Sequence, residues 1–432
     1  VLYYTFPATK QQYGGRAGLK MGDQHKGVPK VDLKDLMDGD IVSEEFIDDY
    51  KKVSSCSGNC SSCQDKCKQF FKPKQRFKVS LQEQNVVITA KLMRFDHIIF
   101  ILSGKGGAGK STLAIQLAYA LAEHYDYKVN LFDADICGPS IPTLTFTQMA
   151  DTNIFVENLG WDPIPLTDRI HLMSAGYLVG DKDTPIIVDG DGKEEFLREM
   201  LFNTNFEFCS PREREEGCKN VLIIDFPPGS SEEHLVMTAL VRRCLMSDSM
   251  VRLSSSGVLS AGHVNSQDQS SIFGDVGDRL DGAINTHERH EAAKSLLAAS
   301  AAAGTKKHLP TIYSLIISTP DEVCLSDVRR EVLFCRTVGL AVRGLVQNMS
   351  GFVCPHCGTN TEIFVPLTGG CERLSAETGI PLLGNLPIDL SLCEAAEEGG
   401  SWQDCVSTHG RVGYDKFLEV VRLMLESNEK SV

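Results

Sequence analysis

Short apolar runs alternate with segments of helical periodicity along much of this chain. The runs are rich in Ile, Val, Leu and Phe, and several end at a polar or acidic residue. After the first run, Leu113, Leu117, Ala120 and Leu121 recur at helical spacing, and 416–426 is a further amphipathic segment. Buried strands that alternate with helices predict an α/β domain with a mostly parallel sheet flanked by helices. The predicted strands are 98–102, 128–132, 170–174, 221–225, 313–318, 341–347 and 382–387.

Other stretches do not follow this alternation. Residues 1–50 form an extension that we expect to be disordered, and the polar segment 51–75 carries four cysteines. A basic, then apolar connector at 68–97 leads into the first strand. From about 247 to 310 the composition shifts to Ser, Ala, Gly, Asp and His, which predicts a low-complexity insertion. The α/β domain is therefore expected to span 95–432, with this insertion inside it.

The glycine-rich stretch SGKGGAGKST, residues 103–112, lies between the first predicted strand and the first helix. This is the context of a P-loop, in which backbone N–H groups and a helix N-terminus converge on phosphate. We expect Lys110 to neutralise the β- and γ-phosphates of ATP, Ser111 to hold Mg²⁺, and Thr112 to lie near the α-phosphate. The predicted nucleotide contacts in this loop are Gly104, Lys105, Gly106, Gly107, Ala108, Gly109, Lys110, Ser111 and Thr112.

Polar residues at the ends of later strands complete the expected site. Carboxyl ends of parallel strands share one edge of a sheet, where ligands bind. Asp135, supported by Asp133, is the candidate to orient the attacking water. Asp225 ends a Walker B run and should meet Mg²⁺ through water, while Gly229 can let the following loop sense the γ-phosphate. Asn348 can pair with adenine through its amide.

Two groups of cysteines suggest metal binding. Four thiols lie close together in a polar segment with little to bury, and a second pair forms a Cys-Pro-His-Cys sequence. Thiolates at the first spacing can hold one zinc ion or one [4Fe–4S] cluster, and spacing alone does not choose between them. The pair supplies half of a four-ligand site, so other groups or a second copy must complete it. The candidate ligands are Cys56, Cys60, Cys63, Cys67, Cys354 and Cys357.

Composition narrows the class of protein. The 432 residues carry a net charge of −14, which argues against a nucleic-acid surface. No apolar run approaches the roughly 20 residues that span a bilayer, and the segment 416–426 carries acids, unlike a basic membrane anchor. Without a secretory signal, grouped cysteines more often bind metal than form disulfides. We therefore expect a cytoplasmic protein, with organellar targeting by residues 1–50 as the open alternative.

Two resemblances extend this interpretation. The GKGGAGKST pattern resembles the deviant Walker A ATPases (MinD, ParA and the nitrogenase iron protein), which implies that Lys105 reaches across a dimer interface to the partner's nucleotide. The ordered motifs DADICGPSIP, DFPPGSSEEHL, STPDEVCLSDVRRE and NMSGFVCPHCG are similar to those of the Mrp/nucleotide-binding protein 35 family. Members of that family are P-loop ATPases that assemble and transfer iron–sulfur clusters, and the resemblance covers roughly 95–246 and 312–395.

The second resemblance implies two [4Fe–4S] sites. A stable cluster would lie on the four N-terminal cysteines, as in the cytosolic assembly scaffolds of the family. A labile cluster would bridge Cys354 and Cys357 of two subunits. The implied partners are a second copy, or a related P-loop ATPase without N-terminal cysteines in a heterotetramer, and recipient apo iron–sulfur proteins. ATP hydrolysis would then drive release of the labile cluster.

The chain departs from the family pattern at three places. The N-terminal cysteines are more compact than usual, which places Cys56 in question as a ligand. Phe226 stands where the family has threonine, and Val188-Asp189-Gly190 replaces Trp-Arg-Gly. These changes predict slow or differently gated hydrolysis. The alternatives are a ParA/MinD-like positioning ATPase, and a zinc-stabilised NTP-binding regulator with no cluster role.

Overall fold

The computed structural model describes residues 80–147, 154–156, 160–178, 190–246, 309–354, 359–364, 368–409 and 411–426. All of these residues belong to one compact unit, residues 79–432. The extension, the four-cysteine segment and most of the predicted insertion lie outside the described residues. Within the described residues, none of the helices has the length and apolar character needed to span a bilayer.

An eight-stranded sheet forms the centre of this unit, in the order β12-β9-β8-β1-β7-β2-β6-β5. Neighbouring strands run parallel except at the edge, where β5 pairs antiparallel with β6. The predicted mostly parallel α/β sheet is therefore confirmed. The strands are β1 (His97–Ser103), β2 (Lys128–Asp133), β5 (Ile164–Pro165), β6 (Ile170–Ser174), β7 (Asn220–Asp225), β8 (Thr311–Ser318), β9 (Val342–Gln347) and β12 (Leu382–Asn385).

The two central strands are apolar along nearly their whole length because helices cover both faces of the sheet. Every residue of β1 and of β7 is buried. A strand buried on both sides needs a continuous apolar run instead of an alternating one. This is the pattern from which the strands at 98–102 and 221–225 were predicted.

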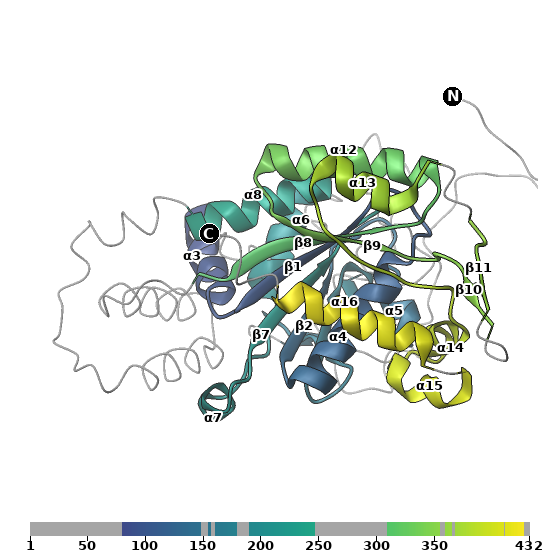
Figure 1. The fold of residues 1–432 in the computed structure, drawn as a ribbon. Coiled ribbons are helices and arrows are strands. Elements are labelled where there is room, and N and C mark those ends of the chain that lie inside the picture. The colour runs from purple at the N-terminus through teal and green to yellow at the C-terminus, as the bar shows by residue number, and fades with distance from the viewer. Residues whose placement is uncertain are drawn as a thin grey trace, which may run out of the picture. The chain divides into compact units, whose positions relative to one another are not determined.

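Helices lie on both sides of the sheet (Figure 1). One layer contains α4 (Lys110–Tyr125) and α16 (Val412–Glu426), which contact each other, and the other contains α12 (Glu322–Val338), α8 (Glu232–Met246) and their neighbours. The second layer is completed by α3 (Leu81–Leu92), α6 (Gly190–Asn203) and α13 (Gly370–Thr378). The shorter elements are α5 (Ile141–Leu144), η3 (Ala175–Leu178), α7 (Pro211–Glu215), α14 (Leu390–Glu398), α15 (Trp402–His409), and the two-residue strands β3 (Phe155–Val156), β4 (Gly160–Trp161), β10 (Phe352–Val353) and β11 (Asn360–Thr361).

Helix α3 lies where we predicted only a connector. Its run of β-branched residues favours a strand on local propensity, but a capping box between Ser80 and Glu83 starts a helix instead. Its C-terminal half is buried against α6 and α8. Buried Lys91 donates from Nζ to the carbonyl oxygens of Phe202 (2.6 Å) and Thr204 (2.7 Å), at the end of α6. Capping and packing thus decide the conformation against local propensity.

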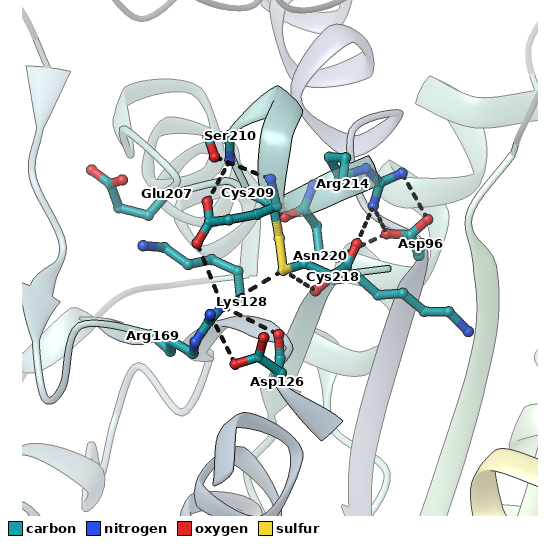
Figure 2. Close-up of a disulfide and its surroundings, with 12 residues drawn as sticks. Asp96, Asp126, Lys128, Arg169, Glu207, Cys209, Ser210, Arg214, Cys218 and Asn220 are labelled. Carbon is teal, nitrogen blue, oxygen red and sulfur yellow. Dashed lines mark hydrogen bonds and ion pairs between the residues drawn. A yellow bond between two sulfur atoms is a disulfide. The ribbon is translucent and has the colours of Figure 1, made fainter. Parts of the chain in front are cut away.

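A disulfide joins Cys209 and Cys218 at the amino-terminal edge of the sheet (Figure 2). The bond closes the loop that contains α7. Beside it, the backbone N–H of Cys209 donates to the Asn220 side chain (2.8 Å), and the Asn220 backbone N–H donates to Asp96 (2.7 Å). Asp96 also pairs with Arg214 of α7 through both terminal guanidinium nitrogens. These two cysteines fit no metal-ligand spacing, so nothing in the sequence alone pointed to them.

Replacing both cysteines with serine should lower the free energy of unfolding by about 2–3 kcal/mol, the loss of loop-closure constraint expected at this short separation of 9 residues. Urea unfolding with and without a reductant measures this difference. The reductant should lower the midpoint of the wild type and leave that of the double variant unchanged. Equal wild-type midpoints in both conditions would show that the bond contributes nothing to stability.

Candidate functional site

The glycine-rich loop joins the carboxyl end of β1 to the first residue of α4, as predicted. Gly107 and Gly109 adopt left-handed backbone conformations, with φ of 80° and 83°. These values are strained for residues with a Cβ, which explains the glycines there. Gly109 is the N-cap of α4, so the unpaired N–H groups of the first helical turn border the loop. This is the geometry that binds phosphate.

Three predicted residues meet at the base of the loop. Lys110 Nζ lies 2.7 Å from Asp225 Oδ1 and donates to Ser111 Oγ at 3.0 Å. The Ser111 hydroxyl donates to Asp225 Oδ2 at 2.7 Å. Lys110 and Asp225 are both buried. The structure thus brings the Walker A lysine and serine onto the Walker B carboxylate, although more than a hundred residues separate them in sequence.

Asp133 and Asp135 occupy different environments at the end of β2. Asp133 is fully buried, and burial together with the nearby Asp225 carboxylate raises its pKa to about 8. It accepts hydrogen bonds from the Ser174 hydroxyl (2.9 Å) and from the Asp135 backbone (3.2 Å). Asp135 is half-buried and accepts from the Gly138 N–H at 3.0 Å. Asp133 therefore supports the strand end from inside, and Asp135 is the more accessible carboxylate.

Ser174 and Lys193 also belong to this region, and neither is among the site residues predicted from the sequence. Ser174 is the polar end of a predicted strand, and that position was the available signal. Lys193 on α6 pairs with Glu233 of α8 at 2.9 Å, and the hydrogen bond to that carboxylate raises the pKa of the lysine. Burial raises the pKa of Asp135, and the charge of Lys193 partly opposes that rise. The positively charged Lys193 thus lies near Asp135. In the sequence it follows closely on Val188-Asp189-Gly190, the segment that replaces the family's Trp-Arg-Gly.

Lys105 is exposed, unlike Lys110. Burial raises the pKa of Asp321, but hydrogen bonds from the Thr319 side chain and the Cys324 backbone lower it, and the charge of Lys105 lowers it further. The net shift of this pKa is downward. No ion pair at Lys105 is found among the described residues. The side chain is therefore placed on the surface beside the loop, and its reach to a partner's nucleotide stays a prediction.

Asn348 contacts the glycine-rich loop itself. Its amide nitrogen donates to the Ala108 carbonyl oxygen at 2.9 Å, and the side chain is buried. The next residue, Met349, has a positive φ of 55°, which makes the turn after β9. In this structure Asn348 supports the loop backbone, and its pairing with adenine stays a prediction.

Gly109→Ala should reduce nucleotide affinity by at least about tenfold, because a Cβ there would lie 2.4 Å from the Asn348 amide nitrogen and displace the loop. Gly379→Ala is the matched control. Gly379 also has a positive φ, 71°, but a Cβ there meets nothing within 4 Å. Calorimetric titration with MgADP should show the loss for Gly109→Ala and wild-type affinity for Gly379→Ala. Equal affinities would show that the Asn348 contact does not position the loop.

The loop after Asp225 is held against the glycine-rich loop. The Gly229 N–H donates to the Ser103 carbonyl oxygen at 2.8 Å, and Gly229 has a positive φ of 75°. The Pro228 ring lies 3.7 Å from the position of a Cβ on Gly106. The predicted γ-phosphate sensor thus directly contacts the end of β1, where the glycine-rich loop begins.

Phe226, the departure from the family's threonine, is fully buried. Its ring packs against Phe100 (centroids 5.2 Å apart) and stacks on His234 (4.7 Å). Residue 226 is therefore part of the hydrophobic core, where its aromatic ring packs against the imidazole of His234 on α8. His234 is 1% exposed, and burial lowers its pKa to about 4.

Acidification should destabilise the folded protein through His234. Between pH 6.5 and 4 the unfolded chain protonates this imidazole and the folded chain does not, so the stabilisation present above pH 6.5 is lost as pH falls. The loss is about 3 kcal/mol at about 1.4 kcal/mol per pKa unit. Urea unfolding at several pH values should give a shallower pH dependence for His234→Asn than for the wild type. Parallel curves would contradict the burial argument.

The thiol sites are described only in part. Cys354 follows β10, is half-buried and free, and its N–H donates to the Thr359 carbonyl oxygen at 3.0 Å. Strands β10 and β11 form a short antiparallel pair around this segment. Cys56, Cys60, Cys63, Cys67 and Cys357 lie outside the described residues. Among the residues that the structure does describe, no group of three or more His, Cys, Asp or Glu side chains could hold a metal ion.

A family model described as "ParA: NUBPL iron-transfer P-loop NTPase" matches residues 94–273 and 302–421. The two matched segments contain the glycine-rich loop, Asp225, Asn348 and the Cys354–Cys357 pair. They also extend into the segment 247–310, which we expected to be a low-complexity insertion. The match thus covers well over half of the chain.

Similar solved structures include three microbial proteins with a bound nucleotide. A nucleotide-binding protein from Archaeoglobus fulgidus in complex with ADP is 21% identical with a TM-score of 0.46, over 76% of this chain and 98% of that one. The septum site-determining protein MinD from Pyrococcus horikoshii, with Mg-ADP, is 17% identical with a TM-score of 0.37, over 77% and 96%. A putative plasmid partition protein from Borrelia burgdorferi bound to AMPPNP is 15% identical with a TM-score of 0.40, over 76% and 98%.

Proposed function

Because the chain belongs to the iron-transfer P-loop NTPases of the Mrp/nucleotide-binding protein 35 family, we propose that it is an ATP-dependent scaffold that assembles [4Fe–4S] clusters and transfers them to recipient apoproteins. The nucleotide-binding part of this proposal rests on one observation. Lys110, Ser111 and Asp225 meet beneath a loop in which two glycines adopt left-handed backbone conformations.

The residues at the base of the loop fit a magnesium nucleotide. The Ser111 hydroxyl and the Asp225 carboxylate are oxygen groups of the kind Mg²⁺ prefers. Asp225 and Asp133 are buried acids whose pKa values are raised by burial, so added positive charge would stabilise their ionised forms. Bound Mg²⁺ would neutralise charge that develops on the phosphates. Lys110 binds the phosphates, and Asp135 orients the attacking water.

Two features support a dimer. Lys105 is exposed beside the loop, where a second copy could bring its nucleotide. Cys354 and Cys357 together supply two thiols, and a [4Fe–4S] cluster takes four. Two copies of the pair would complete one site, and a cluster held between subunits could be released when nucleotide turnover changes the dimer. The cluster is thus cargo, and ATP hydrolysis controls its release.

The N-terminal cysteines would hold the second, stable cluster. We propose Cys56, Cys60, Cys63 and Cys67 as its ligands. The protein would work in the cytoplasm, or in an organelle if residues 1–50 act as a targeting segment. It would form a homodimer, or a heterotetramer with a related ATPase. Recipient apo iron–sulfur proteins would be its transient partners.

The test is the content of iron, acid-labile sulfide and zinc per chain, measured on protein purified without oxygen, together with ATPase activity. Iron and sulfide near four to six per chain, with broad absorption near 400 nm, support the scaffold, because a bridging cluster is shared by two chains. Stoichiometric zinc without iron, even after reconstitution with iron and sulfide, would instead favour the zinc-stabilised NTP-binding regulator. ATP-dependent co-sedimentation with lipid vesicles or DNA, in the absence of iron, would favour the positioning ATPase.

A further inference from the structure

Two buried side chains hold the loop after Asp225 at consecutive serines. The Ser230 hydroxyl donates to Glu331 Oε2 of α12 at 2.7 Å. The Ser231 hydroxyl lies 2.9 Å from His234 Nδ1 of α8, and the Ser231 backbone N–H donates to the same nitrogen at 3.2 Å. The loop that carries Gly229 is therefore attached both to the helix that follows it and to a helix about a hundred residues later.

His234 and Glu331 each have a second polar atom, and these two atoms face each other without a hydrogen bond. His234 Nε2 and Glu331 Oε1 are 3.7 Å apart, and the two side chains are 1% and 0% exposed. Neither atom has a hydrogen-bond partner within the described part of the chain. Buried polar groups are almost always paired, so two facing unpaired atoms indicate an arrangement that can change.

The protonation states suit a bond between these atoms. Because a backbone N–H donates to Nδ1, the proton of the neutral imidazole must lie on Nε2, which faces the carboxyl oxygen. Burial lowers the pKa of His234 to about 4, so the ring is neutral near pH 7. Burial raises the pKa of the Glu331 carboxyl group, and the hydrogen bond from Ser230 opposes that rise. With the carboxylate ionised, a donor faces an acceptor at a distance that a shift of about 1 Å would bring into the hydrogen-bonding range.

Helix α12 also contacts the glycine-rich loop. A Cβ added to Gly104 would lie 2.6 Å from the backbone nitrogen of Val328, so loop and helix backbones are in close contact there. The Phe334 ring of the same helix lies edge-on to His234, with centroids 6.0 Å apart. A shift of the 226–231 loop would therefore act on α12, which already contacts the phosphate-binding loop.

We propose that Glu331 and His234 are positioning residues for ATP hydrolysis: a hydrogen bond from His234 Nε2 to Glu331 Oε1 forms when bound nucleotide shifts the 226–231 loop, and it fixes that loop against α12 in its reactive position. This inference rests on the proposed ATPase function and adds to it the residues that set the loop. Neither side chain touches the nucleotide in this scheme; both act through Ser230, Ser231 and the loop backbone.

The test compares Glu331→Gln, His234→Asn and the double variant. Gln keeps an acceptor for Ser230 and replaces the oxygen that faces Nε2, while Asn keeps an acceptor near Nδ1 and removes Nε2. Each single variant should lower kcat for ATP hydrolysis about tenfold with KM within about twofold, and the double variant should lose no more than either single one. Arg330→Gln is the control: Arg330 is exposed on α12 beside Glu331 and should leave kcat unchanged.

Thermal unfolding and MgADP affinity are measured on the same variants. Wild-type kcat in the single variants, losses that multiply in the double variant, or a fall in kcat that also appears in Arg330→Gln would overturn the inference. A wild type that binds no nucleotide would overturn the proposed function together with it. A wild type that hydrolyses ATP, with variants that match it, would overturn this inference alone.

Discussion

Lys110→Ala should lower the affinity for MgATP and MgADP by about 100-fold or more. The ammonium group of Lys110 lies at the base of the glycine-rich loop, where it can neutralise phosphate charge from a largely buried position. A charged hydrogen bond of this kind contributes about 1.5–3 kcal/mol, and the loss of more than one reaches the 100-fold range. Calorimetric titration with MgADP measures the change directly, without turnover.

The same substitution should also destabilise the folded chain, because it leaves Asp225 buried without its cation. Removal of one partner from a buried ion pair costs about 3–5 kcal/mol. The double variant Lys110→Met with Asp225→Asn removes both charges and should regain stability in urea unfolding, but not nucleotide affinity. Recovery of both properties, or affinity within about threefold of the wild type in Lys110→Ala, would contradict the role of Lys110.

Cys354→Ser should abolish transferable [4Fe–4S] cluster while leaving MgADP affinity unchanged. The thiol is half-buried after β10, whereas the nucleotide residues lie at the carboxyl ends of β1, β2 and β7. Loss of one thiolate from a pair leaves a shared four-thiolate site incomplete in both subunits, so the effect should approach total loss. Reconstitution with iron and sulfide, followed by activation of an apo iron–sulfur protein, measures transfer.

Cys393→Ser is the matched control. Cys393 is free and exposed on α14, and we assign it no ligand role. It should retain wild-type transfer. Undiminished transfer in Cys354→Ser would overturn the bridging-cluster proposal, and equal loss in both variants would show that the assay responds to thiol content in general.

The core of the fold follows from local patterns. Strands β1 and β7 are continuous apolar runs because both faces of the sheet are covered, and that pattern can be recognised without the structure. The glycine-rich loop is equally local, since Gly107 and Gly109 occupy conformations that other residues adopt at a cost. The meeting of Lys110 and Asp225 also follows, because parallel strands bring their carboxyl ends to one edge.

Other features depend on contacts between distant segments. Helix α3 was missed because its β-branched residues favour a strand, and only its cap and its burial against α6 and α8 decide otherwise. The disulfide between Cys209 and Cys218 has no signature in local spacing.

The sequence by itself therefore determined the class of fold, the phosphate-binding loop and the candidate ligands, because each rests on residue types at fixed short spacing. Only the tertiary structure decided which polar groups are buried together. Glu331 ends one motif and His234 lies in another, and each looks like an ordinary helix residue until α8 and α12 pack side by side. Burial then turns two ordinary side chains into a donor and an acceptor that face each other away from water, where a missing hydrogen bond is costly.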